Sequence, residues 1–231
     1  MDINKSYPCN PGNYAVMDDK RNEYIVIHYV GATGTALQNV QYFERSPTIG
    51  ASAHYFVGHA SEDGAVYQSV DPKDRAWHCG AQSYKHPYCR NANSIGIEMC
   101  CHKDTQGNWY FDDVTIARTA QLTEMLMDTY DIPLVNVLRH YDVTGKLCPA
   151  PLVDEFAWLL FKQRLEGPVM GEKTGDNPSS WAVDHTEWAK AKGIIYGDGQ
   201  GNYDWQGPVT REAMAAMLHN FAVAFGLEKE D

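Results

Sequence analysis

Four residues of the chain have the types and spacing that a metal-assisted reaction needs. His28 and His140 lie at or near the ends of strand-like stretches, and Cys148 follows His140 by eight residues with a glycine between them. Two histidines and a cysteine can hold zinc and leave its fourth tetrahedral position open for water, as in a catalytic site. Glu98 interrupts a third apolar stretch and could move protons there. Spacing alone leaves the alternative that each histidine is a core or rim residue.

The first 165 residues alternate strand-like and helix-like segments that could position these side chains. Strands are predicted at 23–30, 53–57, 65–70, 94–100 and 135–140, and helices at 35–44, 113–130 and 151–165. This order predicts an α/β fold in which helices flank a mixed central β-sheet. Strands that end together bring their side chains to one rim of the sheet, so we expect His28, Glu98 and His140 to lie close together.

Five short motifs surround these residues: IVIHYV at 25–30, SAHY at 52–55, AWHCG at 76–80, NSIGIE at 93–98 and the loop 139–149. Together and in this order they closely resemble the zinc-dependent N-acetylmuramoyl-L-alanine amidases. That family includes phage endolysins, cytosolic wall-recycling amidases and peptidoglycan recognition proteins. The resemblance spans roughly residues 20–165 and implies a zinc amidase catalytic domain at 1–165. It implies zinc ligands and catalytic residues at these positions: His28, His140 and Cys148 as ligands, and Glu98 and Lys146 in catalysis.

The roles implied by the resemblance follow ordinary zinc chemistry. Zinc lowers the pKa of bound water towards roughly 7 and polarises the amide carbonyl. Glu98 would take a proton from that water and pass it to the leaving amine, while Lys146 would stabilise the oxyanion. A salt bridge for Glu98 and a solvated position for Lys146 are the alternatives. Some phage members have a catalytic tyrosine where this chain has Ala53, so the chain resembles the glutamate-dependent branch and Tyr55 is given no catalytic role.

Several polar residues near the motifs are expected to support the site. The resemblance places His78 and Trp77 along a peptide-binding groove, although a packing role for Trp77 fits equally well. His54 and His59 are expected to be structural. Asp142 is expected to order the loop that carries the ligands or to orient a histidine from outside the ligand set.

The composition changes near residue 166. Residues 166–178 are rich in glycine, proline and charge, which predicts a linker. Residues 179–231 predict a small helical domain and resemble one S-layer homology repeat through WA at 181–182, EWA at 187–189, KGII at 192–195, GDG at 197–199 and VTRE at 209–212. Such modules bind secondary cell-wall polymers.

For the C-terminal segment, the resemblance makes Arg211 the candidate for anion binding and lets Trp181 and Trp188 stack on sugars. The alternative is that both tryptophans are core residues and that Arg211 lies on a helix surface. The family usually combines three repeats into one binding unit. A single repeat therefore puts polymer binding in question or suggests a homo-oligomer formed through this domain.

Charge and composition exclude several other classes of function. The formal net charge of −11 argues against nucleic-acid binding and against a polybasic membrane-surface protein. No stretch approaches the roughly 18 apolar residues of a membrane helix, and residues 1–10 lack an apolar signal core. We therefore expect synthesis in the cytoplasm without a signal peptide. In such a compartment the six cysteines are expected to be thiols or metal ligands.

Three functions are compatible with these features of the sequence. The first is a peptidoglycan hydrolase of the endolysin or autolysin type that cleaves the amide between N-acetylmuramic acid and L-alanine. It would reach the wall after a separate protein permeabilises the membrane. The second is a cytosolic amidase that recycles soluble muropeptides, which would not need the C-terminal segment. The third is a non-catalytic peptidoglycan-binding protein, which would not need an open zinc position.

Overall fold

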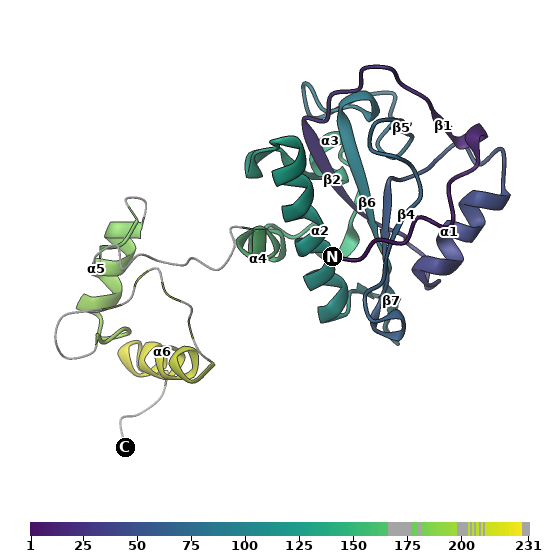
Figure 1. Ribbon diagram of the computed structural model, residues 1–231. Helices are drawn as coiled ribbons and strands as arrows, with labels where there is room; N and C mark the ends of the chain where they lie inside the picture. The colour runs from purple at the N-terminus through teal and green to yellow at the C-terminus, as the bar shows by residue number, and fades with distance from the viewer. Residues whose placement is uncertain are drawn as a thin grey trace. The chain divides into compact units, whose positions relative to one another are not determined.

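Figure 1 shows the computed structural model, which describes residues 1–165, 177–179, 182–197, 203, 205, 207, 209 and 211–227. The chain divides into two compact units, Met1–Glu166 and Gly167–Asp231, and each is described by itself. Apart from residues 177 and 178, the predicted linker lies outside the described residues. Within the described part, no helix combines the length and apolar character needed to cross a bilayer.

The larger unit is built on a five-stranded mixed sheet, which confirms the predicted α/β fold. Its strands lie in the order β4 (Val66–Gln68), β3 (Tyr55–Val57), β6 (Ser94–Met99), β2 (Tyr24–Tyr29) and β9 (Val137–Arg139). Strands β3, β6, β2 and β9 are parallel to one another, and β4 runs antiparallel to β3. The parallel strands therefore end at the same rim of the sheet.

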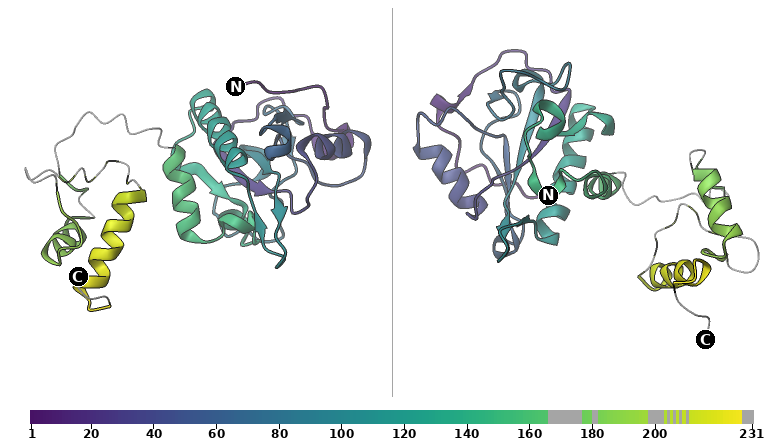
Figure 2. Two further views of the ribbon diagram at one scale, coloured as in Figure 1. Left: turned by 90° about the horizontal axis from the view of Figure 1, so that it is seen from below. Right: turned by 180° about the vertical axis from the view of Figure 1, so that it is seen from behind.

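Helices cover both faces of this sheet (Figures 1 and 2). Helices α2 (Asp113–Tyr130) and α4 (Glu155–Leu165) contact each other on one face, and α2 also contacts β3 and β6. Helix α1 (Ala36–Arg45) lies on the other face against β3 and β4. The short helix α3 (His140–Thr144) follows β9 directly, so it begins at the rim.

Strand β6 shows how the sequence separates core from site. Side chains alternate between the two faces of a strand, so its residues fall into two sets. Ile95, Ile97 and Met99 are fully buried in the core that also contains Leu122, Leu126 and Phe161 of α2 and α4. The opposite face carries Ser94, Gly96 and Glu98. Polar and small residues on this second face leave room for functional side chains.

The helix predicted at 151–165 is interrupted, so that prediction was wrong for residues 151–154. A 3-10 turn covers Ala150–Leu152, and α4 begins only at Glu155. The cause is the buried guanidinium of Arg139, which donates hydrogen bonds to the carbonyls of Leu152 and Val153. Asp154 then starts α4, because its Oδ1 accepts from the amides of the next turn.

Shorter elements complete the larger unit. The remaining strands pair antiparallel and are β1 (Tyr14–Ala15) with β5 (Arg75–Ala76), and β7 (His102–Lys103) with β8 (Trp109–Tyr110). The 3-10 turns outside the 150–152 segment cover Pro11–Asn13, Ala60–Glu62, Asn91–Asn93 and Leu134–Asn136.

The described residues of the smaller unit include the helices α5 (Val183–Ala191) and α6 (Arg211–Ala224), in agreement with the predicted helical domain. Trp188 is 48% exposed and stacks on Phe225, with ring centroids 6.2 Å apart, so it is not a core residue. Trp181 and the side chain of Arg211 lie outside the described residues.

Candidate active site

Neighbouring parallel strands bring the first two candidate residues together. His28 on β2 and Glu98 on β6 are directly paired in the register of the sheet, so their side chains leave the same face. His140 begins α3 immediately after β9, which pairs with the other edge of β2. The structure thus places all three at one rim, as the sequence predicts.

An ion-pair network centred on the buried Arg139 holds the loop that supplies Cys148. Arg139 is 3% exposed and pairs with both Asp142 and Glu155, each at 2.8 Å. The Asp142 carboxylate also accepts from the Arg139 amide, so Asp142 orders this loop through Arg139 rather than by contacting a histidine. The Cys148 carbonyl accepts from the amide of Tyr141, which ties the far end of the loop back to α3.

His28, His140 and Cys148 form a buried group that could hold a metal ion. One ligand atom from each residue lies within 4.8 Å of the others. The Cys148 Sγ is 3.7 Å from Nδ1 of His28, and the two histidine ring centroids are 4.6 Å apart. Nδ1 of His140 is buried and has no hydrogen-bond partner among the described residues. A buried nitrogen without a partner is costly unless it serves as a ligand.

Burial controls the protonation of these three groups. It lowers the pKa of His140 to about 4, with help from the positive charge of Lys146, and lowers that of His28 far below its ordinary value. Both imidazoles are therefore neutral near pH 7, as metal ligation requires. Burial raises the pKa of Cys148 to about 12, so a metal ion must displace its proton on binding.

Glu98 has the surroundings of a proton-transfer group. Its Oε2 is buried, and no hydrogen-bond partner for it is found in the described part of the chain. Burial raises the pKa of this carboxyl to about 8, although the positive charge of Lys146 opposes the shift. Lys146 itself lies exposed in the loop before Cys148. A carboxyl with a pKa near the working pH can both accept and return a proton.

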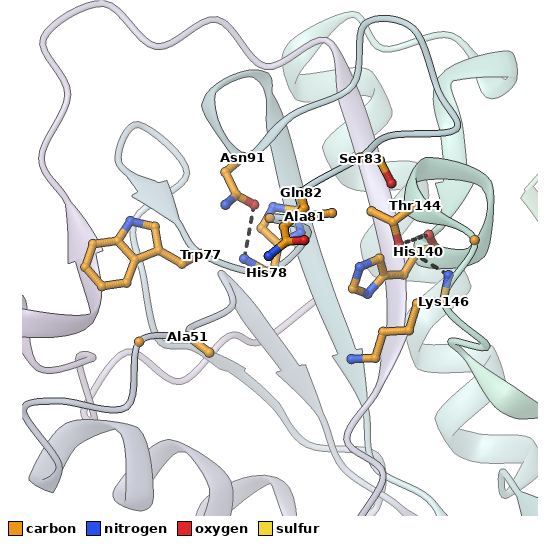
Figure 3. Close-up of a pocket in the computed structure, with 13 residues that line it drawn as sticks. Ala51, Trp77, His78, Ala81, Gln82, Ser83, Asn91, His140, Thr144 and Lys146 are labelled. Atoms are coloured by element: carbon orange, nitrogen blue, oxygen red, sulfur yellow. Dashed lines mark hydrogen bonds between the residues drawn. The ribbon is translucent and has the colours of Figure 1, made fainter.

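A cavity of about 850 Å³ opens beside this group (Figure 3). Its lining residues are Gly50, Ala51, Trp77, His78, Gly80, Ala81, Gln82, Ser83, Asn91, His140, Thr144, Gly145 and Lys146. Trp77 stands on one side of it, and His140 and Lys146 stand on the other. His78 also lines it, but both ring nitrogens already have protein partners, Nδ1 with His28 and Nε2 with Ser94.

The other histidines singled out by the sequence lie apart from this group. His54 is fully buried, and its Nδ1 accepts from the amide of Gly96. His59 joins His102 and Asp112 in a second cluster with ligand-type atoms within 4.8 Å. There the groups already satisfy one another: His102 Nε2 lies 2.9 Å from Asp112, and His59 Nδ1 lies 2.9 Å from the Ser61 hydroxyl. Tyr55 is buried in the core beneath α2.

Sequence reasoning missed two residues that support the site, Ser94 and Arg139. Ser94 bonds His78, and Arg139 anchors the loop that carries the ligands. The signal for Ser94 was available, because it shares the alternating face of β6 with Gly96 and Glu98. Arg139 gave no such signal, since its partners Leu152 and Val153 are predicted to be helical.

The sequence and the fold resemble those of known proteins. Residues 18–151 match the family described as N-acetylmuramoyl-L-alanine amidase, and residues 176–215 match the S-layer homology domain. N-acetylmuramoyl-L-alanine amidase CwlL of Bacillus licheniformis is 30% identical over 166 residues, which cover 68% of this chain and 44% of CwlL. The match spans less than half the length of CwlL and less than half the length of two other Bacillus amidases.

Two solved structures are similar to this chain in fold. The structure of PlyL is 26% identical and covers 71% of this chain and 97% of its own, with a TM-score of 0.59. The catalytic domain of XlyA is also 26% identical and covers 71% of this chain and 99% of its own, with a TM-score of 0.57. Since the family match covers more than half of the sequence, this chain belongs to the N-acetylmuramoyl-L-alanine amidase family.

Proposed function

We propose that this chain is a zinc-dependent peptidoglycan hydrolase that cleaves the amide between the lactyl group of N-acetylmuramic acid and L-alanine. The observation that carries the proposal is the convergence of His28, His140 and Cys148 beside Glu98 at one rim of the sheet. Family membership supports this reaction, and the convergence supplies the residues that such a reaction needs.

The three donors fit zinc. Two neutral imidazoles and one thiolate are ligand types that zinc prefers, and three protein ligands leave one position for water or substrate. The unpartnered Nδ1 of His140 is the structural feature that a bound cation would explain. When bound, zinc polarises the substrate carbonyl and lowers the pKa of water.

Glu98 and Lys146 divide the remaining chemistry. The Glu98 carboxylate takes a proton from the attacking water and returns it to the nitrogen of L-alanine as the amide breaks. Lys146, at the edge of the cavity, brings positive charge to the oxygen on which negative charge develops. The products are a free lactyl carboxylate on the sugar and a peptide with a free amino terminus.

The cavity supports binding of the stem peptide. Trp77 forms an apolar wall opposite His140 and Lys146, so a peptide lying along it would present its first amide to the site. His78 can contact such a peptide only through its ring carbons, because its nitrogens are engaged. We assign substrate contact first to Trp77 and then to His78.

The smaller unit is proposed to hold the enzyme at the cell wall. Its match to the S-layer homology domain supports binding of a secondary cell-wall polymer, with Arg211 and the half-exposed Trp188 as the contact residues. Attachment of this kind favours a lytic enzyme of the endolysin or autolysin type over a recycling amidase. Association of chains through this unit, to complete the usual set of repeats, is part of the same proposal.

The proposal is tested by digesting purified Gram-positive peptidoglycan with the full chain and added zinc. New amino-terminal L-alanine and new reducing sugar ends are measured in the same digest. We expect new L-alanine termini and no new reducing ends. Tight binding to the wall with neither product, across several wall types, would favour the binding-protein alternative. Equal activity on soluble muropeptides with and without residues 167–231, and no binding to walls, would favour the recycling alternative.

A further inference from the structure

A chain of buried hydrogen bonds leads from the backbone to His28. Ser94 Oγ lies 2.6 Å from the carbonyl oxygen of Arg90 and 3.2 Å from Nε2 of His78. Nδ1 of His78 lies 3.0 Å from Nε2 of His28. His28, His78 and Ser94 are each no more than 9% exposed, so these bonds are largely shielded from water.

The Arg90 carbonyl sets the direction of every bond in this chain, because it can only accept a hydrogen bond. The Arg90 carbonyl has no proton, so the single hydroxyl proton of Ser94 is donated to it. Ser94 Oγ must then accept from His78, which puts the His78 proton on Nε2. With its one proton on Nε2, the His78 ring presents an acceptor at Nδ1, and His28 satisfies it by donating from Nε2. His28 therefore keeps a free lone pair on Nδ1, the nitrogen 3.7 Å from the Cys148 sulfur.

We propose that His78 and Ser94 are positioning residues that hold His28 in the one tautomer that can bind zinc through Nδ1. This inference rests on the proposed function, because it takes His28 as a metal ligand. It assigns His78 to the metal site and only secondarily to the groove. Ser94 acts on His28 indirectly, because it fixes the tautomer of His78. Outer groups that orient a histidine ligand commonly matter for metal affinity, and here a neutral imidazole takes the place of a carboxylate.

The sheet is shaped to hold His78 in this orientation. Gly96 lies under its ring, and a Cβ at that position would come within 2.5 Å of His78 Cγ. The amide of His78 donates to Asn91 Oδ1, which fixes its backbone (Figure 3). His28 and His78 meet edge to face at 90°, the arrangement in which one ring nitrogen can point at another. The glycine between Ile95 and Ile97 is thus explained by the imidazole that it accommodates.

The tautomers can be read directly by long-range ¹H–¹⁵N correlation spectra of the full chain labelled with ¹⁵N-histidine. Signals are assigned from the variants His28→Asn and His78→Asn. In the chelator-treated protein we expect both His28 and His78 to carry their protons on Nε2, and we expect zinc to leave that of His28 in place. A proton on Nδ1 of His28 in the metal-free protein would overturn the proposal.

Zinc affinity, measured by competition with a chromophoric chelator, supplies the second readout. His78→Leu removes the acceptor and should weaken zinc binding by about 10- to 100-fold. His78→Asn places an amide oxygen near the position of Nδ1 and should recover much of that loss. Ser94→Ala frees His78 to change tautomer and should weaken binding by a smaller factor, with His78 now showing a mixed tautomer signal.

Ser69→Ala is the matched control, because it also removes a buried hydroxyl but lies outside this hydrogen-bond chain. We expect it to leave zinc affinity unchanged. Wild-type affinity in both His78→Leu and Ser94→Ala would overturn the proposal. If His78→Leu does not fold, Ser94→Ala and the spectra of the wild-type chain still decide it. A wild-type chain that binds no zinc would contradict the proposed function, while the metal-free spectra would still test the tautomer.

Discussion

Replacing Glu98 with glutamine separates the chemical role of this carboxyl from its cost to stability. The variant keeps the size of the side chain but cannot carry a proton to the leaving amine. Loss of a positioned general acid or base typically slows a reaction by about 10²- to 10⁴-fold. We therefore expect Glu98→Gln to lose activity by that factor while its zinc content stays at the wild-type level.

Although Glu98→Gln should lose activity, the zinc-free variant should be more stable than the zinc-free wild type near neutral pH. The folded pKa of Glu98 is raised from 4.5 to about 8, so the unfolded state ionises at a lower pH than the folded state. Stability contributed by this group is then present below pH 4.5 and is lost as the pH rises towards 8. At about 1.4 kcal/mol per pKa unit, the loss accumulated between pH 4.5 and pH 7 comes to about 3 to 4 kcal/mol. Glutamine does not ionise and escapes this loss.

Urea denaturation of both zinc-free proteins at pH 4 to 8 measures the difference. The free energy of unfolding of Glu98→Gln, relative to wild type, should rise across this range. Glu124→Gln makes the same chemical change on α2, away from the site, and should follow the wild-type profile. A difference that stays flat with pH would refute the assigned burial of the Glu98 carboxyl. Near-wild-type hydrolysis by Glu98→Gln would refute its role in proton transfer.

Three other changes give distinct results. Cys148→Ala should lose the tightly bound equivalent of zinc, seen as a zinc-to-protein ratio near zero by elemental analysis after dialysis, whereas Cys101→Ala should retain it. Lys146→Ala should keep its zinc and lower the rate by about 10²- to 10³-fold in a muropeptide assay, with partial recovery in Lys146→Arg. Gly96→Ala drives a methyl group against His78 and should cost about 1–3 kcal/mol in denaturant unfolding; an unchanged midpoint would contradict the close contact.

Strand periodicity made much of the catalytic unit predictable. The alternation in SIGIEM identifies a strand with Ile95, Ile97 and Met99 on the core face, and it places Glu98 on the other face. His28 and His140 end neighbouring parallel strands, so their convergence with Glu98 follows from the topology of the sheet. These features are local in sequence or follow from the way parallel strands end together.

Features that depend on contacts between distant residues could not be predicted in the same way. The helix expected at 151–165 is broken because Arg139 donates hydrogen bonds to carbonyls of its expected first turn. No local sequence pattern reveals that contact. His78 looks like a groove residue in the sequence, since its bond to His28 joins residues 50 positions apart. The exposure of Trp188 likewise depends on how the two C-terminal helices pack.

The most direct test of the proposed reaction is hydrolysis of one defined muropeptide in ¹⁸O-labelled water, with the products weighed by mass spectrometry. Water attack at the lactyl carbonyl should put one ¹⁸O into the carboxylate of the sugar product and leave an unlabelled peptide with a free L-alanine amine. The reaction should stop when zinc is removed and resume when it is restored. Label at the sugar C1 or within the peptide would show that another bond is cut and would contradict the assignment of this site.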